Sequence, residues 1–106
     1  MADRVAAFLA MLERGQDSAL LRFSLGNEYL AQRDPAAAVV HLEAAVAQDR
    51  NYSAAWKLLG KAFAENGEPR RAIEAWRTGI EVAGEQGDRQ AAREMQVFVR
   101  RAERAL

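Results

Sequence analysis

Apolar side chains recur every three or four residues along most of the chain, the spacing that places them on one face of an α-helix. Val5, Phe8 and Leu12 form the first such stripe, and Met95 and Phe98 belong to the last. No segment alternates apolar and polar positions with the β-branched enrichment that is typical of a strand. The pattern therefore predicts an all-helical protein.

Capping and turn residues divide this pattern into separate helices. Asp34 is a suitable N-cap, and Pro35 after it suits the first helical position, where its missing N–H has no partner to lose. Glu68 and Pro69 repeat this start signal, and Gly67 suits the left-handed cap that ends the preceding helix. Asp88 is the N-cap candidate of the last helix. Together these signals predict six helices, over about 3–14, 18–32, 35–48, 52–65, 69–83 and 88–105.

A shift of the sequence by 34 residues brings similar residues into register. Tyr29 then aligns with Phe63, and Leu42 aligns with Trp76. Every aligned pair is a position where a helix hairpin would be packed, so we expect two tandem helix-turn-helix repeats. The identical pairs are Leu25 and Leu59, Gly26 and Gly60, Pro35 and Pro69, and Ala38 and Ala72.

Two of these identical residues are glycines inside strongly periodic helices. Glycine in a helix interior costs about 1 kcal/mol relative to alanine, so Gly26 and Gly60 need a compensating interaction. Close approach of a partner helix would supply it. We expect Ala38 and Ala72 to be the small residues across that contact.

The repeats resemble the tetratricopeptide repeat signature. The first repeat departs from the pattern at Arg22, where the family favours tryptophan. The resemblance implies an all-α fold, a fragment of a right-handed superhelix of antiparallel helix hairpins. The signature residues of the second repeat are Trp56-x2-Leu59-Gly60-x2-Phe63 and then Ala72-x3-Trp76, and those of the first are Leu25-Gly26-x2-Tyr29 and then Ala38-x3-Leu42.

The segments outside the two repeats are predicted to cap the stack. In the first helix, Val5 and Leu12 align with Val39 and Val46, which is the pattern of the second half of a repeat. The last helix loses the signature when shifted by 34 residues but keeps an apolar face that can close the stack. We therefore expect a single domain over 1–106, with an N-terminal cap at 3–14, repeats at 19–52 and 53–86, and a C-terminal cap at 88–105.

The resemblance also implies a function. In proteins of this family the first helix of each repeat lines a concave groove that receives an extended peptide or a helix of a partner protein. Lys57 and Lys61, the only lysines, are one turn apart there, so an acidic segment or a C-terminal carboxylate is a candidate ligand. The predicted groove residues are Phe23, Asn27 and Leu30 in the first repeat and Lys57, Lys61 and Ala64 in the second.

Two alternatives compete with this interpretation. The lysines could be ordinary solvated charges while Phe23 packs against the neighbouring helix. The groove or a cap helix could instead self-associate, which would make the protein a homo-oligomer without a separate ligand. The carboxylate clamp of some family members is not carried over, because Phe23 stands where its first lysine would be.

Charge does not favour nucleic acid as a partner. Fifteen basic and fifteen acidic residues leave no net charge, so any electrostatic recognition must be local. The last helix has an arginine stripe flanked by Glu94 and Glu103, and no aromatic residue interrupts it to stack on bases. We interpret the stripe as a solvated cap, with an acidic ligand as the alternative. It consists of Arg89, Arg93, Arg100 and Arg104.

The chain lacks the residues that catalysis would need. His41 is the single histidine, cysteine is absent, and no phosphate-binding loop or nucleophile motif is present. We therefore expect neither an enzyme nor a metal or cofactor site. No apolar run is long enough to cross a bilayer, and the start does not resemble a secretory signal, so the sequence predicts a cytoplasmic protein without membrane contact.

Overall fold

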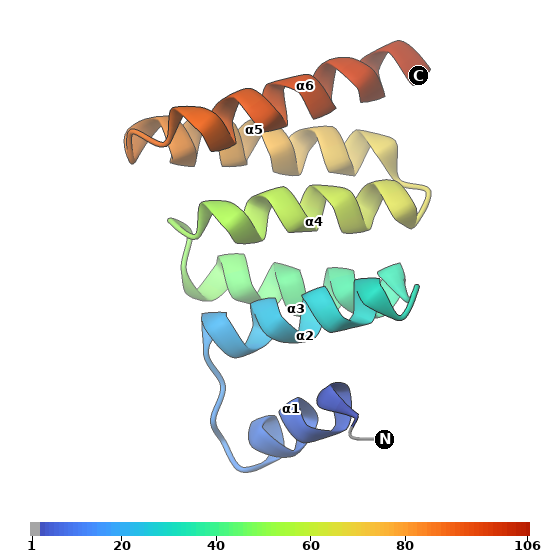
Figure 1. Ribbon diagram of the computed structural model, residues 1–106, viewed down its shortest axis with the longest axis vertical. Helices are drawn as coiled ribbons and strands as arrows, with labels where there is room; N and C mark the ends of the chain where they lie inside the picture. The colour runs from blue at the N-terminus through green and yellow to red at the C-terminus, as the bar shows by residue number, and fades with distance from the viewer. Residues whose placement is uncertain (1–2) are drawn as a thin grey trace.

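The protein is all-helical, as predicted (Figure 1). A computed structural model describes residues 3–106, and these residues contain six α-helices and no strand. The helices are α1 (Arg4–Glu13), α2 (Ala19–Ala31), α3 (Pro35–Gln48), α4 (Ser53–Glu65), α5 (Pro69–Glu85) and α6 (Arg89–Ala105).

The helices stack in chain order along the longest axis of a molecule that measures 40 × 28 × 21 Å. Each helix from α2 to α6 packs against the next one in the chain. In addition the backbone of α4 comes close to those of α2 and α6, whereas the backbones of α3 and α5 do not come close to each other within the described residues. In Figure 1 the paler α3 and α5 lie behind the other helices of the stack. The arrangement is therefore two layers, and the layer of α2, α4 and α6 is the more closely spaced.

Two of the predicted helix caps form, and one does not. The carboxylates of Asp34 and Asp88 accept the backbone N–H of the third residue of α3 and α6 at 3.2 and 3.1 Å. Glu68 makes no such bond at the start of α5. Its longer side chain turns away and accepts from Asn66 Nδ2 at 2.8 Å and from Arg71 at 3.3 Å. Glu68 is therefore the N-cap residue of α5 by position, and Pro69 occupies the first turn as predicted, but the side chain of Glu68 does not cap the helix.

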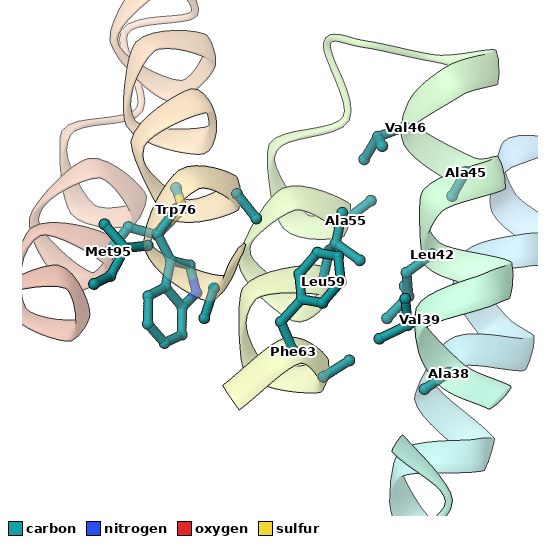
Figure 2. Packing of buried hydrophobic residues seen from close by; sticks show 14 of the residues in the cluster. Ala38, Val39, Leu42, Ala45, Val46, Ala55, Leu59, Phe63, Trp76 and Met95 are labelled. Atoms are coloured by element: carbon teal, nitrogen blue, oxygen red, sulfur yellow. The ribbon is translucent and has the colours of Figure 1, made fainter. Parts of the chain in front are cut away.

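The helix glycines allow close packing with the second helix of their own repeat, as expected. A Cβ added at Gly26 would overlap Leu42, and one added at Gly60 would overlap the indole of Trp76. That indole is fixed by a hydrogen bond from its Nε1 to the backbone oxygen of Lys57 at 3.0 Å. Ala38 and Ala72 are fully buried, but they are not the groups nearest to the glycines. Figure 2 shows the surrounding core between α3 and α4.

The last helix follows the repeat pattern at a different spacing. α5 extends to Glu85, two residues beyond the predicted end, and α6 begins at Arg89, 36 residues after the start of α4 at Ser53. Met95 and Val99 are buried in α6 and follow Leu59 and Phe63 of α4 by 36 residues instead of 34. α6 thus occupies the place of the first helix of a third repeat, which the 34-residue shift concealed.

The first helix is attached less extensively. α1 packs against α2 alone among the described helices, and its Val5 joins Leu21 and Leu25 in a small separate core. The remaining apolar side chains of α1 are only partly buried, among them Phe8 and Leu12. The stack therefore has one firmly packed end, at α6, and one lightly packed end, at α1.

The turns that join the two helices of each repeat have matching geometry. Gly67 has a φ of 77°, and Arg33, 34 residues earlier, has a φ of 62°. Both are in the left-handed region, which glycine adopts freely and which a side chain with a Cβ adopts at a cost. Arg33 is the only non-glycine residue with positive φ in the described chain.

Replacing this arginine by glycine should therefore stabilise the protein. We expect Arg33→Gly to raise the free energy of unfolding by about 0.5 to 1 kcal/mol, measured by urea denaturation. The matched control is Gly67→Arg, which imposes the same strain on the second turn and should lower the free energy of unfolding. An unchanged or less stable Arg33→Gly variant would contradict the strain argument.

Candidate peptide-binding surface

The first helices of the two repeats and α6 share one side of the molecule. Since the backbones of α2, α4 and α6 approach one another more closely than those of α3 and α5, the stack curves toward the side of α2, α4 and α6. We call this side the concave face. Its central row consists of Asn27, Lys61 and Val97, which occupy equivalent positions on the three helices when the 36-residue offset of α6 is included.

Phe23 is engaged with a neighbouring helix. Its ring stacks on that of Tyr52, at the start of α4, with 5.0 Å between centroids and 28° between planes. Burial of Tyr52, together with the nearby Asp49, raises the pKa of its hydroxyl above the usual value. Phe23 itself is half-buried and packs against the main core. Only part of its ring is therefore available to a ligand.

The two lysines differ in environment although they are one turn apart. Lys57 is half-buried, its Nζ lies 3.1 Å from Glu94 Oε1, and it stands 5.9 Å from the ring centroid of Phe98. Lys61 is exposed, and no carboxylate among the described residues lies within ion-pair distance of it. The charge of Lys57 is therefore largely balanced within the protein, whereas that of Lys61 faces solvent.

The other predicted groove residues also differ in their exposure to solvent. Asn27 and Ala64 are exposed, but Leu30 is only 9% exposed and belongs to the core. Leu20, which the sequence analysis did not select, is 66% exposed and precedes Asn27 on α2 by seven residues, so it lies on the same side of the helix. The sequence could have indicated this residue, because Leu20 is apolar but lies outside the buried stripe of its helix.

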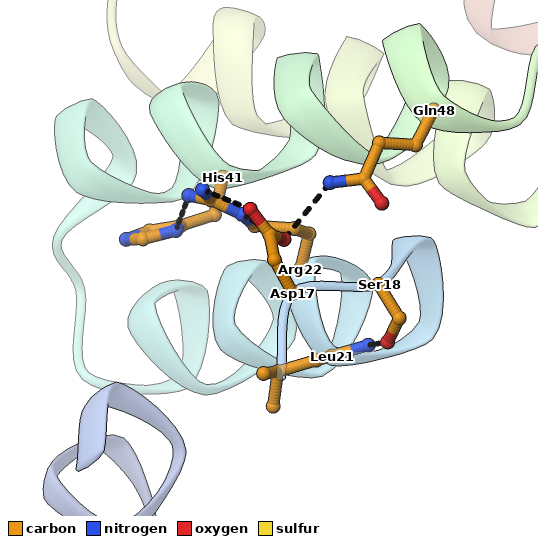
Figure 3. Close-up of polar contacts among 6 residues, drawn as sticks. All are labelled: Asp17, Ser18, Leu21, Arg22, His41 and Gln48. Carbon is orange, nitrogen blue, oxygen red and sulfur yellow. Dashed lines mark hydrogen bonds and ion pairs between the residues drawn. The ribbon is translucent and has the colours of Figure 1, made fainter. Parts of the chain in front are cut away.

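A polar network surrounds Arg22, where the signature has tryptophan (Figure 3). The guanidinium donates to both carboxylate oxygens of Asp17, at 2.9 and 2.8 Å, and Gln48 Nε2 donates to the same carboxylate at 2.8 Å. These hydrogen bonds lower the pKa of Asp17 to about 2. Arg22 also donates to His41 Nδ1 at 3.1 Å, and the ring of His41 stacks on Tyr29. In the second repeat the equivalent pair is Trp56 and Ala75.

This arrangement requires a neutral His41. A guanidinium can only donate, so Nδ1 must accept and the ring proton must be on Nε2. Burial and the charge of Arg22 lower the pKa of His41 below its usual value of 6.5. The unfolded chain consequently binds a proton at a higher pH than the folded protein does.

Stability should therefore fall as the solution is acidified through the unfolded pKa. We expect the free energy of unfolding to decrease between about pH 7.5 and about pH 5.5, before the carboxylates titrate. His41→Asn keeps an acceptor but cannot titrate, and it should flatten this dependence. Urea denaturation at several pH values measures the effect, and an equal slope in both proteins would exclude His41 as its source.

The arginine stripe of α6 lies at the exposed end of the stack. Arg89, Arg93 and Arg100 are exposed, and so is Gln96, which stands in α6 where Gly60 stands in α4. Gly60 packs against the second helix of its own repeat, whereas the equivalent side of α6 is covered by no described helix. The polar stripe therefore covers a surface that would otherwise require a packing partner.

Features of other functional classes are absent from residues 3–106. No group of three or more histidine, aspartate or glutamate side chains there could hold a metal ion. None of the helices in this part of the chain is both long and apolar enough to cross a membrane.

Comparison with known proteins agrees with this geometry. The structure resembles a solution structure of a protein from Bordetella parapertussis, with a TM-score of 0.85 and 42% identity, covering 99% of this chain and 91% of that chain. It also resembles a crystal structure of a tetratricopeptide repeat domain protein from Salinibacter ruber, with a TM-score of 0.75 and 29% identity over 82% of this chain and 97% of that chain.

The sequence comparisons give the same result. A TPR repeat-containing protein of Pseudomonas aeruginosa is 50% identical over 95 residues, which is 90% of each chain. The family model described as tetratricopeptide repeat matches residues 29–95.

The fold is thus an array of antiparallel helix hairpins, as found in helical repeat proteins. The chain belongs to the tetratricopeptide repeat family. This fold is a general module for protein–protein interaction.

Proposed function

We propose that the concave face binds an extended peptide or a helix of another protein, and that the chain acts as an adaptor rather than as an enzyme. The observation that carries the proposal is the exposed, unpaired Lys61 between the exposed Asn27 and the half-buried Val97. A cation flanked by an amide and apolar surface suits a peptide with a carboxylate beside an apolar side chain.

The remaining groove residues have supporting roles in this proposal. Leu20 provides apolar contact at the edge of the face, and Ala64 keeps the surface next to Lys61 low enough for a backbone to approach. Phe23 contributes the edge of its ring, while Leu30 and the ion-paired Lys57 hold the face in shape. The acidic nature of the ligand follows from Lys61 alone.

The proposal can be tested by affinity capture from native lysate. The partner recovered by the wild-type protein is compared with that recovered by the Lys61→Glu variant. We expect this single reversal to reduce the recovered partner about tenfold, because it replaces attraction by repulsion at the centre of the face. The matched control is Arg70→Glu, another exposed cation without an ion pair, on α5 in the other layer. Equal recovery by the two variants would contradict the proposal.

Self-association through the same face is the alternative. The largely exposed Leu20 is the observation in its favour, because an apolar side chain of this size gains by burial against a second copy. Sedimentation equilibrium distinguishes the two functions. Self-association predicts a mass that rises with concentration and falls back to that of a monomer in Leu20→Ser, whereas peptide binding predicts a monomer throughout.

A further inference from the structure

A cleft of about 530 Å³ lies on the side of the molecule opposite the concave face. α3 and α5 form its walls, and α4 runs along its floor between them. Trp56, Leu59 and Phe63 of α4 line the floor. The volume is within the range of about 300 to 1,000 Å³ in which proteins bury apolar ligand groups.

The walls have a regular helical spacing. From Glu43 to Arg50 on one side, and from Arg71 to Thr78 on the other, the lining positions follow the pattern i, i+3, i+4, i+7. At about 1.5 Å per residue, each wall is about 10 Å long, or two helical turns. A groove between two helical ridges over an apolar floor fits the side chains of a third helix, spaced at i, i+3 or i+4, and i+7.

An ion pair closes one end of the cleft. Arg71 of α5 lies 3.8 Å from the carboxylate of Glu43 on α3, so the pair crosses from one wall to the other. The same guanidinium lies 4.8 Å from the ring centroid of Phe63 and also pairs with Glu68. The charges at this end are therefore satisfied within the protein.

The other part of the cleft has two charged side chains that are exposed to solvent. Arg50 follows α3 at the open end, and Glu74 stands on the α5 wall, one helical turn from Arg71. Neither side chain forms an ion pair or a hydrogen bond with the described residues. An occupant that brings a carboxylate to Arg50 and a cation to Glu74 would complement both.

We propose that this cleft is a second recognition site, which binds an amphipathic helix of another protein. The apolar side chains of that helix lie over Trp56, Leu59 and Phe63. An acidic residue at one end pairs with Arg50, and a basic residue about one turn away pairs with Glu74. Because the site is on the face opposite Lys61, it does not depend on the proposed function of the concave face.

The probe is a hydrocarbon-stapled synthetic helix of about 15 residues with a fluorescent label. It carries leucines at i, i+3 and i+7, a glutamate placed for Arg50 and a lysine placed for Glu74. A second peptide has the glutamate and the lysine exchanged for residues of opposite charge. Binding is measured by fluorescence anisotropy with the full chain.

A matched pair of alanine variants locates the peptide on the protein. Ala47 is exposed on the α3 wall of the cleft, and Ala54 is exposed on α4 outside it. We expect Ala47→Arg to weaken binding about tenfold or more by obstructing the cleft, and Ala54→Arg to leave it unchanged. Circular dichroism of both variants verifies that the helices are intact. Loss of binding in Ala54→Arg alone would place the peptide on the concave face and overturn the proposal.

A charge exchange tests the recognition itself. Arg50→Glu with Glu74→Arg should lose about tenfold in affinity for the first peptide and gain affinity for the charge-exchanged one. Failure of wild-type protein to bind the first peptide at about 1 mM would overturn the proposal. So would sedimentation equilibrium showing a dimer that Ala47→Arg dissociates, because the occupant would then be a second copy of this chain.

Discussion

Ending the chain at Gly87 should abolish cooperative unfolding. The truncation removes Met95, which is fully buried against the second repeat, and the ring of Phe98, which lies 5.4 Å from that of Trp76. It also removes Met95 from the position of Gly79 on α5, which faces its sulfur. Each large apolar side chain contributes about 1.5 to 3 kcal/mol by burial, and the total approaches the stability of a small domain, about 5 to 15 kcal/mol.

Thermal and urea denaturation followed by circular dichroism measure this effect. The fragment should lose the sigmoidal transition of the full chain or form aggregates through the exposed α5 surface. Met95→Ala in the full chain is the graded control, and we expect it to cost about 2 to 5 kcal/mol while leaving the transition cooperative. A monomeric fragment as stable as the full chain would refute the capping role of α6.

Gly60→Ala should destabilise the protein by about 2 kcal/mol, although alanine favours helices more than glycine does. The new Cβ would overlap the indole of Trp76. The indole cannot move aside easily, because its Nε1 donates a hydrogen bond to the backbone oxygen of Lys57 and its ring packs against that of Phe98. The steric cost should therefore exceed the gain in helix propensity.

Two other glycines provide the comparison. Gly26 faces the more adaptable Leu42, so Gly26→Ala should cost less than Gly60→Ala. Gly84 lies within α5, and an added Cβ there would meet no atom within 4 Å. Gly84→Ala should raise the free energy of unfolding by about 0.5 to 1 kcal/mol. If urea denaturation gave the three variants equal stability, close helix packing would not be the reason for glycine at position 60.

The elements that could be predicted from the sequence are those set by local or periodic patterns. Asp34 and Asp88 cap their helices because a short carboxylate reaches the backbone N–H groups close to it in the chain. The paired glycines could be identified because the repeat places them at the same position twice. Glu68 marks the start of α5 as Asp34 marks that of α3, but its longer side chain bonds to Asn66 instead of the helix backbone, which the start signal alone could not reveal.

The candidate surface was harder to predict from the sequence, because it depends on contacts between repeats. Lys57 is paired because Glu94 of α6 reaches it, and that contact depends on two residues added near the end of α5. The same addition places Val97, rather than Met95, beside Lys61. Sequence reasoning with a fixed 34-residue period could not detect this change of register. The cleft between α3 and α5 could not be predicted in the same way, because its lining comes from two repeats and forms only when they pack together.

The network of Arg22 and His41 makes the two hairpins differ in their response to pH, although their backbones are similar. The second hairpin has Trp56 and Ala75 at the equivalent positions, and neither side chain titrates, whereas Arg22 and His41 of the first lose their complementarity in acid. The first hairpin also adjoins the lightly attached α1. Mild acid should therefore loosen the molecule in one direction, from the N-terminal end inward, while the α5 and α6 end keeps its structure.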